Sequence, residues 1–365
     1  MIKQLKAFTI NMVAGANIAT VILMLAAGFS DRLNPVEHPL LSCFGMAFPI
    51  FLVVNLLFLF FWLTFKWKRA WIPIEGYVLA YVPLSIYMPV NMKRDLPEGV
   101  IKVLSYNVCQ YGGNFKYEQG FDTVYNYLKR QAADIVCLQE DADSWRRYVM
   151  QRYAKIYPYN DTTIFRNDIE GMNGVGIHTR FPILRKERIW YKSAANGSVA
   201  YYLKLDNGDT LLVINNHLEG THLSKEDRAN YKRMIRGKME RDTAKEESIQ
   251  LLDKLSTSAV KRAPEAEAVH RYIEEHRQYP IVVCGDFNDN PISYSRRTIA
   301  QGLTDCFVKT GRGLGLSYNQ KGFYFRIDHI LCSDCFEPYN CEIDDEMDAS
   351  DHYPILCWLK MKENH

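Results

Sequence analysis

Polar side chains that could bind a metal ion or a phosphoryl group follow six apolar stretches in the second part of this 365-residue sequence. They are Asn107, Glu140, Asn215 with His217, Asp286 with Asn288, Asp328 with His329, and Asp351 with His352. Carboxylate and amide oxygens bind hard cations, and an amide can also donate to an anion. A lone Glu after a strand or a lone His usually has a structural role. Six such positions in one domain indicate a shared site if sheet packing gathers them.

The stretch from Pro280 to Pro291 shows the pattern most clearly. Ile281 to Gly285 carries no charge and is typical of a buried strand. Because strand side chains alternate with period two, Asp286 and Asn288 fall on one face at its polar end. The alternative interpretation is a strand that runs into an Asx-rich turn.

Alternating strands and helices are expected to position these residues. Residues 121–131 have helical spacing, and Asn207-Gly208 predicts a tight hairpin turn. The charged stretch 224–278 has apolar residues at helical intervals, and Pro264 is expected to divide it into two helices. The expected strands are 101–108, 134–140, 174–179, 200–206, 210–216, 281–285, 325–332 and 354–359.

The first 95 residues differ sharply in composition from the remainder. They hold eight Lys/Arg and four Asp/Glu, which leaves 44 − 8 = 36 basic and 42 − 4 = 38 acidic residues for the rest. Three apolar runs, about 7–29, 40–65 and 71–90, each approach the ~20 residues that a spanning helix requires. We therefore predict a membrane anchor of three transmembrane helices over 1–95 and a soluble domain over 96–365. A cleaved leader would explain the first run only.

Flanking charges predict the orientation of this multi-pass anchor. Lys3 and Lys6 precede the first run, and Lys66, Lys68 and Arg69 separate the second from the third. With three spans, positive-inside counting places the N-terminus in the cytoplasm and the soluble domain on the outer side, periplasmic or extracellular. The third run contains Pro73, Glu75 and Pro83. If it lies only at the interface, the sidedness inverts.

Cysteine usage leaves the redox compartment open. Cys137, Cys284 and Cys357 lie in apolar strand-like runs and are expected to be buried free thiols. Cys332 and Cys335, with Cys341 nearby, could form a disulfide or half of a zinc site. No second C-x-x-C or histidine pair completes such a zinc site.

The ordered motifs carry a family resemblance. They read Leu104-Ser-Tyr-Asn107, Asp134-Ile-Val-Cys-Leu-Gln-Glu140, Asn215-Asn-His217, Gly285-Asp-Phe-Asn288, Ile327-Asp-His-Ile330 and Ser350-Asp-His352-Tyr-Pro354. The series resembles the endonuclease/exonuclease/phosphatase superfamily, with its deoxyribonuclease I-like fold. The resemblance implies an α+β fold, a four-layer α/β/β/α sandwich of two packed mixed sheets with outer helices. It also implies a phosphate-ester hydrolase that uses Mg²⁺, with Mn²⁺ as a substitute.

The resemblance also implies residue roles. Glu140, helped by Asn107 and supported by Asp351, would hold Mg²⁺. His352 would be the general base acting on water, and Asp328 would orient it. His217 and Asn288 would stabilise phosphoryl charge, and Asp286 would position the nucleophile or assist the leaving group. For His329 and Asn215, supporting or structural roles are equally open, and His178 is expected to be structural.

The substrate is constrained less than the chemistry. Nucleases need cationic surface, and the balance of 36 basic to 38 acidic residues does not supply one. The basic residues between Lys225 and Arg241 alternate with acidic ones, which favours a solvated helix face. A membrane anchor favours a substrate at or outside the membrane, which could be a phospholipid or sphingolipid head group, a scavenged nucleotide or extracellular nucleic acid. No protein partner can be inferred. The competing hypothesis is a catalytically idle, membrane-tethered binding domain. Such a domain should have lost at least one of the motif residues, but all of them are present.

Overall fold

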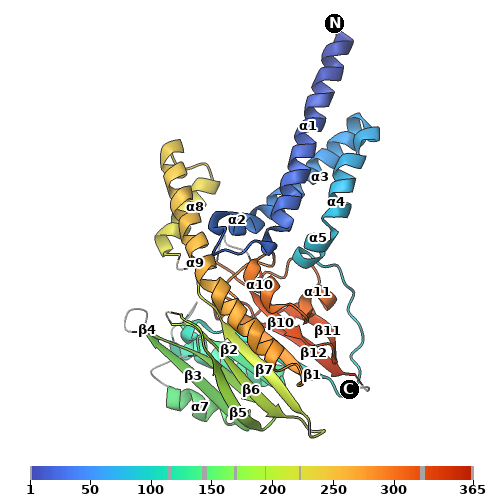
Figure 1. Ribbon diagram of the computed structural model, residues 1–365. Coiled ribbons are helices and arrows are strands. Elements are labelled where there is room, and N and C mark those ends of the chain that lie inside the picture. The colour runs from blue at the N-terminus through green and yellow to red at the C-terminus, as the bar shows by residue number, and fades with distance from the viewer. Residues whose placement is uncertain are drawn as a thin grey trace.

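The computed structural model describes residues 2–112, 117–141, 146–167, 171–193, 195–221, 223–320 and 325–362. A helical N-terminal part stands on one side of a β-sandwich (Figure 1). The chain order of the strands and helices does not follow their order in space, so residues distant in sequence meet at the strand ends.

Two mixed β-sheets form the sandwich. Within the described residues each has six strands, in the orders β11-β12-β1-β2-β4-β3 and β5-β6-β7-β8-β10-β9. β1 runs parallel to β2, β7 runs parallel to β8, and the other described pairs are antiparallel. The strands are β1 Ile101–Asn107, β2 Ile135–Gln139, β3 Tyr159–Asn167, β4 Gly171–Thr179, β5 Ile183–Ile189, β6 Gly197–Lys204, β7 Thr210–His217, β8 Ile281–Asp286, β9 Thr304–Asp305, β10 Asp328–Cys332, β11 Phe336–Ile343 and β12 Ile355–Met361.

The sheets pack face to face around an apolar core. Val103 and Val175 of the first sheet meet Val213 and Ile330 of the second in one buried cluster. A second cluster joins the outer face of the first sheet to α6 (Tyr117–Gln131) and α7 (Arg146–Tyr153). A third joins the outer face of the second sheet to α9 (Arg241–Glu275). The predicted packing of two mixed sheets with helices outside is confirmed.

The charged stretch after β7 breaks at a different place from the one predicted. α8 (Lys225–Ile235) and α9 (Arg241–Glu275) are separated by a turn in which Gly237 has φ +62°. The expected break at Pro264 is wrong, because α9 continues through it. An internal proline costs roughly 3 kcal/mol. Burial of Ala263, Ala266 and Val269 on both sides of it offsets that cost.

The third apolar run does not form one helix. It consists of α4 (Trp71–Leu79) and α5 (Tyr81–Tyr87), which are interrupted at Ala80. Pro83 lacks the N–H that would bond the Leu79 carbonyl, and its ring clashes with that group, so the helix is interrupted there. Two stretches, Gln4–Arg32 and Pro39–Phe65, are long and apolar enough to cross a membrane. The expected third transmembrane helix is not among them.

The helical part has amides inside and apolar side chains outside. Between α1 (Ile2–Gly28) and α3 (Phe48–Phe65), Asn17 Nδ2 donates to Asn55 Oδ1 at 2.9 Å, and Trp62 Nε1 donates to Asn17 Oδ1 at 2.9 Å. Both asparagines are fully buried, whereas Phe8 is 63% and Phe60 is 60% exposed. Buried polar pairs and an apolar exterior are typical of helices that pack together in a membrane.

The helical part is joined to the sandwich by a packed interface. Ile292, from the loop after β8, is buried in a cluster with Met24, Ala27 and Phe48. A side chain at Gly45 would collide with the Ile292 carbonyl. Elsewhere in this interface, Arg326 donates to the Ile86 carbonyl, and the short helix α2 (Pro39–Ser42) packs against α9. The remaining short helices are η1 Ser30–Arg32, η2 Cys43–Ala47, η3 Trp67–Arg69, η4 Cys109–Tyr111, α10 Tyr294–Ile299 and α11 Cys306–Thr310.

The nine cysteines, all within the described ranges, are free thiols. Cys137, Cys284 and Cys357 are buried, as predicted. Cys332 and Cys335 do not form a disulfide, and no cysteine belongs to a cluster suited to a metal ion among the described residues. The C-x-x-C therefore contributes core volume.

Candidate active site

Strand register aligns three of the expected site residues in the second sheet. β7 and β8 run parallel and end together, with His217 opposite Asp286. β10 runs antiparallel to β8 and begins at the same edge, with Asp328 opposite Asp286. The three side chains therefore come from neighbouring strand ends.

The first sheet supplies a carboxylate and an amide at the same edge. Asn107 ends β1, and Glu140 directly follows β2 with φ +53°. The Asn107 Nδ2 donates to Glu140 Oε1 at 3.1 Å and to Asp286 Oδ2 at 3.0 Å. One buried amide thus connects carboxylates from the two sheets.

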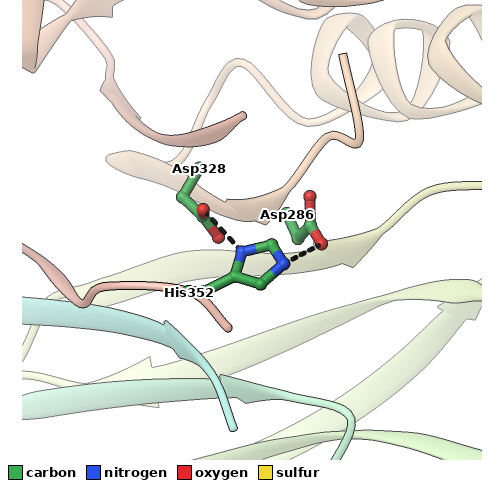
Figure 2. A group of neighbouring side chains, drawn as sticks. All are labelled: Asp286, Asp328 and His352. Carbon is green, nitrogen blue, oxygen red and sulfur yellow. Dashed lines mark hydrogen bonds and ion pairs between the residues drawn. The ribbon is translucent and has the colours of Figure 1, made fainter. Parts of the chain in front are cut away.

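His352 lies just before β12 and contacts two carboxylates. Its Nδ1 is 2.9 Å from Asp328 Oδ2, and its Nε2 is 3.7 Å from Asp286 Oδ2 (Figure 2). With Nδ1–H donating to Asp328, Nε2 of the neutral ring carries the lone pair. The histidine is therefore oriented on one side and available to accept a proton on the other.

His217 is oriented through its other nitrogen. Its Nδ1 lies 3.1 Å from Nδ2 of Asn173, a residue of β4. The amide donates, so the neutral ring carries its proton on Nε2. Nε2 lies 3.8 Å from both Glu140 Oε1 and Asp286 Oδ2. Sequence reasoning missed Asn173, which is 44 positions away and belongs to no motif.

Asn288 and Asp351 complete the group at the surface of the site. Asn288 has φ +52°; its backbone N–H donates to Asp286 Oδ1 at 2.7 Å and its Nδ2 donates to the Leu218 carbonyl at 2.9 Å. Asn288 and Asp351 line a cavity of about 380 Å³, together with Glu140, Asp286 and His352. The other members of the group, Asn107, His217 and Asp328, do not line this cavity.

Three other polar candidates lie elsewhere. Asn215 is buried between the sheets, where its Nδ2 donates to the carbonyls of Leu138 and Gly176 and its Oδ1 accepts from Gln139. The fully buried ring of His329 packs against Phe287 at 5.0 Å, and neither of its nitrogens has a hydrogen-bond partner among the described residues. His178 pairs with Asn160 on the first sheet. All three have structural surroundings.

The site concentrates negative charge in a buried place. Burial raises the pKa of Asp286 to about 6 and also raises the pKa of Glu140. Burial alone would lower the pKa of His352, but the Asp328 and Asp286 carboxylates hold it well above its usual range. Burial lowers the pKa of His217. The His352 imidazole therefore favours the charged form, and the His217 imidazole favours the neutral form.

Comparison with known families agrees with this arrangement. The model of the endonuclease/exonuclease/phosphatase family matches residues 104–352, which include every candidate site residue from Asn107 to His352. The chain belongs to this family. A second model, of a domain of unknown function, matches residues 10–87 in the helical part. No curated protein matches the chain.

Solved structures of the endonuclease/exonuclease/phosphatase family share the fold. A family protein from Bacteroides thetaiotaomicron is 17% identical, with coverage of 73% of this chain and 96% of its own and a TM-score of 0.50. The human Nocturnin catalytic domain with bound sulfate is 14% identical, with coverage of 74% and 98% and a TM-score of 0.51. At these identities the likeness shows the fold alone.

Members of the endonuclease/exonuclease/phosphatase family are hydrolases of phosphate esters and are generally metal-dependent. The donor set of this chain fits a cation. Asp286, Asp328 and His352 each place a ligand atom within 4.8 Å of the others. Asp328 Oδ1 is buried without a hydrogen-bond partner among the described residues. A cation bound at Glu140, which lines the same cavity as Asp286 and His352, would compensate these crowded carboxylates.

Two residues outside the family motifs also reach the site. The Tyr318 ring lies 5.1 Å from that of His352, and the Arg228 guanidinium lies 5.9 Å from the Tyr318 ring centroid. Arg228 lines the cavity and forms no ion pair with a carboxylate of the described residues. The interpretation of its stretch as a solvated face holds for exposed Arg233 and Arg236 and fails for Arg228.

Proposed function

We propose that this protein is a membrane-anchored, Mg²⁺-dependent phosphoesterase that hydrolyses a phosphate ester by attack of water. The observation that carries the proposal is the Asp328–His352 hydrogen bond beside Asp286 and Glu140 at a cavity. A base, a residue that orients it and neighbouring acidic groups are the parts that metal-assisted hydrolysis requires.

Glu140 would hold the cation, with Asn107 and Asp351 beside it; Mn²⁺ could replace Mg²⁺. When bound, the cation would polarise the phosphoryl group and neutralise its negative charge. Asn107 has a further role in this scheme, because its amide fixes the carboxylates of both Glu140 and Asp286.

In its neutral form, which a bound cation would favour by offsetting the charge of Asp286 and Asp328, His352 would take the proton from the attacking water at Nε2. Asp328 accepts from Nδ1, which fixes the tautomer and stabilises the imidazolium that forms. Asp286, 3.7 Å from Nε2, would position the water or assist the leaving group. The P–O ester bond breaks as the water oxygen bonds to phosphorus, and the leaving oxygen then takes a proton.

His217 and Asn288 would stabilise charge on the phosphoryl oxygens. The lowered pKa of His217 and the Asn173 contact favour a neutral ring with its N–H at Nε2, on the side of Glu140 and Asp286. Asn288 is held by the Leu218 carbonyl beside the cavity. Donors that are fixed in advance stabilise developing charge without reorganisation.

The arrangement of the helical part supports an outward-facing domain. Asp31 of η1, just after α1, lies 3.8 Å from Arg297 of α10. The chain enters β1 from the same end of the bundle. The N-terminus and the Lys66–Arg69 turn lie at the opposite end (Figure 1). If α1 and α3 cross a membrane, α4 and α5 must return across it. Positive-inside counting then puts the catalytic domain outside.

The test is hydrolysis by the full-length protein in detergent. Bis-p-nitrophenyl phosphate and p-nitrophenyl phosphate are supplied with Mg²⁺ or with EDTA. We expect Mg²⁺-dependent turnover of at least one, and a loss of about 10²- to 10⁴-fold in His352→Ala. A folded protein without turnover of either compound, and without Mg²⁺ binding by calorimetry, would be the idle binding domain instead.

A further inference from the structure

The walls of the catalytic cavity come from outside the β-sandwich. One wall is the loop between the two apolar N-terminal helices, which contributes Pro35, Cys43 and Met46. Another wall is the α8–α9 hairpin, which contributes Leu251 and Leu255. The two are in direct contact, because α2 packs against α9. The cavity is therefore a compartment shared by the catalytic domain and the membrane anchor.

Polar and apolar surfaces are segregated within this cavity. The acidic groups and His352 lie at the sandwich end. The hairpin presents the half-buried side chains of Leu251 and Leu255, and half-buried Leu223, just before α8, also lines the cavity. A small hydrophilic phosphate ester would leave these side chains facing water. An amphiphile with one phosphate and one apolar part would cover both surfaces.

Arg228 stands where the phosphate of such a molecule would lie. It comes from α8, lines the cavity and reaches Tyr318, whose ring contacts His352. Among the described residues this guanidinium has no carboxylate partner, so it can provide the cation that an anionic head group requires. The same hairpin exposes Arg233, Arg236, Lys238 and Arg241 among the acidic residues Glu226, Glu240 and Asp242.

The cavity lies on the membrane side of the catalytic domain. In Figure 1, α8 and the first half of α9 stand on the same side of the sandwich as α1 and α3. Leu40 and Leu41 of α2 are 58% and 56% exposed beside this hairpin. Basic residues near a membrane surface gain about 1 kcal/mol each from anionic lipids. The hairpin is thus placed to meet lipid head groups.

We propose that the substrate is a membrane lipid that carries a phosphate ester, with its apolar chains between loop 35–46 and the α8–α9 hairpin and its phosphate at Arg228 and His352. The inference rests on the proposed phosphoesterase function and names its substrate class. A polynucleotide does not fit, because its backbone needs an open cationic groove rather than leucine walls.

The experiment measures chain-length preference in the full-length protein in mixed micelles. The probes are phosphatidic acid and phosphatidylglycerol, each with dioleoyl and with dibutyryl chains, beside bis-p-nitrophenyl phosphate and plasmid DNA. We expect at least a tenfold higher kcat/KM for the dioleoyl form of one lipid. Leu251→Asp with Leu255→Asp should reduce that preference at least tenfold.

Leu252→Asp is the matched control, because Leu252 lies on the same helix, is 39% exposed and does not line the cavity. It should leave the preference unchanged. Thermal melting of each variant verifies that the fold is intact. Turnover of bis-p-nitrophenyl phosphate or DNA without any preference for long chains would overturn the lipid assignment and leave the phosphoesterase standing. Inactivity on every probe would overturn both.

Discussion

Nδ1 of His352 lies 2.9 Å from Oδ2 of Asp328, and both residues sit at the ends of strands that belong to different sheets. Asp328 begins β10 in the second sheet, and His352 precedes β12 in the first. The hydrogen bond therefore forms only when the two sheets pack against each other as they do in the folded protein. If His352 is the proton acceptor, its orientation depends on an intact sandwich.

Asp328→Asn should reduce kcat by about 10²- to 10⁴-fold, because the imidazole loses both its orientation and the charge that stabilises its protonated form. In the metal-free protein the Asp328 carboxylate holds the pKa of His352 above its usual range. The variant should therefore lower that pKa, measured by NMR titration of the ring. Asp334→Asn, at an exposed position, is the control and should change neither quantity. An unchanged His352 pKa in Asp328→Asn would contradict the assigned pairing.

Glu140→Gln should weaken Mg²⁺ binding by at least tenfold in apparent affinity, and so raise the Mg²⁺ requirement or abolish activity, because a neutral amide replaces a carboxylate ligand. Titration of activity with Mg²⁺ measures this change, and circular dichroism verifies the fold. Glu274→Gln, at the exposed end of α9, serves as the control. Full activity of Glu140→Gln at low Mg²⁺ would remove Glu140 from the metal site.

His329→Phe should make the protein more resistant to acid. Burial lowers the pKa of His329 from 6.5 to about 3, so between these values the unfolded chain binds a proton that the folded chain excludes. Stability is therefore lost as pH falls through this window, by on the order of 1 kcal/mol per pH unit. The variant should have a higher Tm than the wild type at pH 5 and a smaller difference at pH 7. Equal differences at the two pH values would show that His329 does not titrate in this way.

A reporter that folds only outside the cytoplasm should be active when it is fused after His365. The same reporter inserted after Lys68 should be inactive, because that turn lies at the opposite end of the helical bundle. Enzyme activity of the two fusions in intact cells provides the measurement. The reverse pattern would place the catalytic domain in the cytoplasm.

Local sequence signals sufficed where an apolar strand ends in a polar side chain. Ile281 to Gly285 was predicted as a strand, and the structure extends it by one residue to Asp286. The same signal located β1 and β2 within one residue at each end. It was not sufficient for β5, an edge strand in which Arg185 and Lys186 are exposed, since such a strand has no continuous apolar run.

The parts that sequence did not reveal depend on tertiary contacts. Asn173 orients His217 from a different sheet, and neither residue type nor spacing marks it. Pro264 was expected to break a helix, but the surrounding apolar residues are buried on the second sheet. Met46 and Leu251 line the same cavity although they are about two hundred positions apart in the sequence. No local pattern could predict that they share a cavity.

The packed interface at Gly45 and Ile292 determines how far the active site can travel. A domain on a flexible linker would sweep through a volume of solution set by the length of the linker. Here the sandwich is fixed to the bundle by apolar packing and by the Arg326 contact to Ile86, so its cavity stays at one height relative to the helices. In a membrane, such an enzyme would sample a thin layer. Its rate would then follow the number of substrate molecules per unit area and respond little to the concentration in solution.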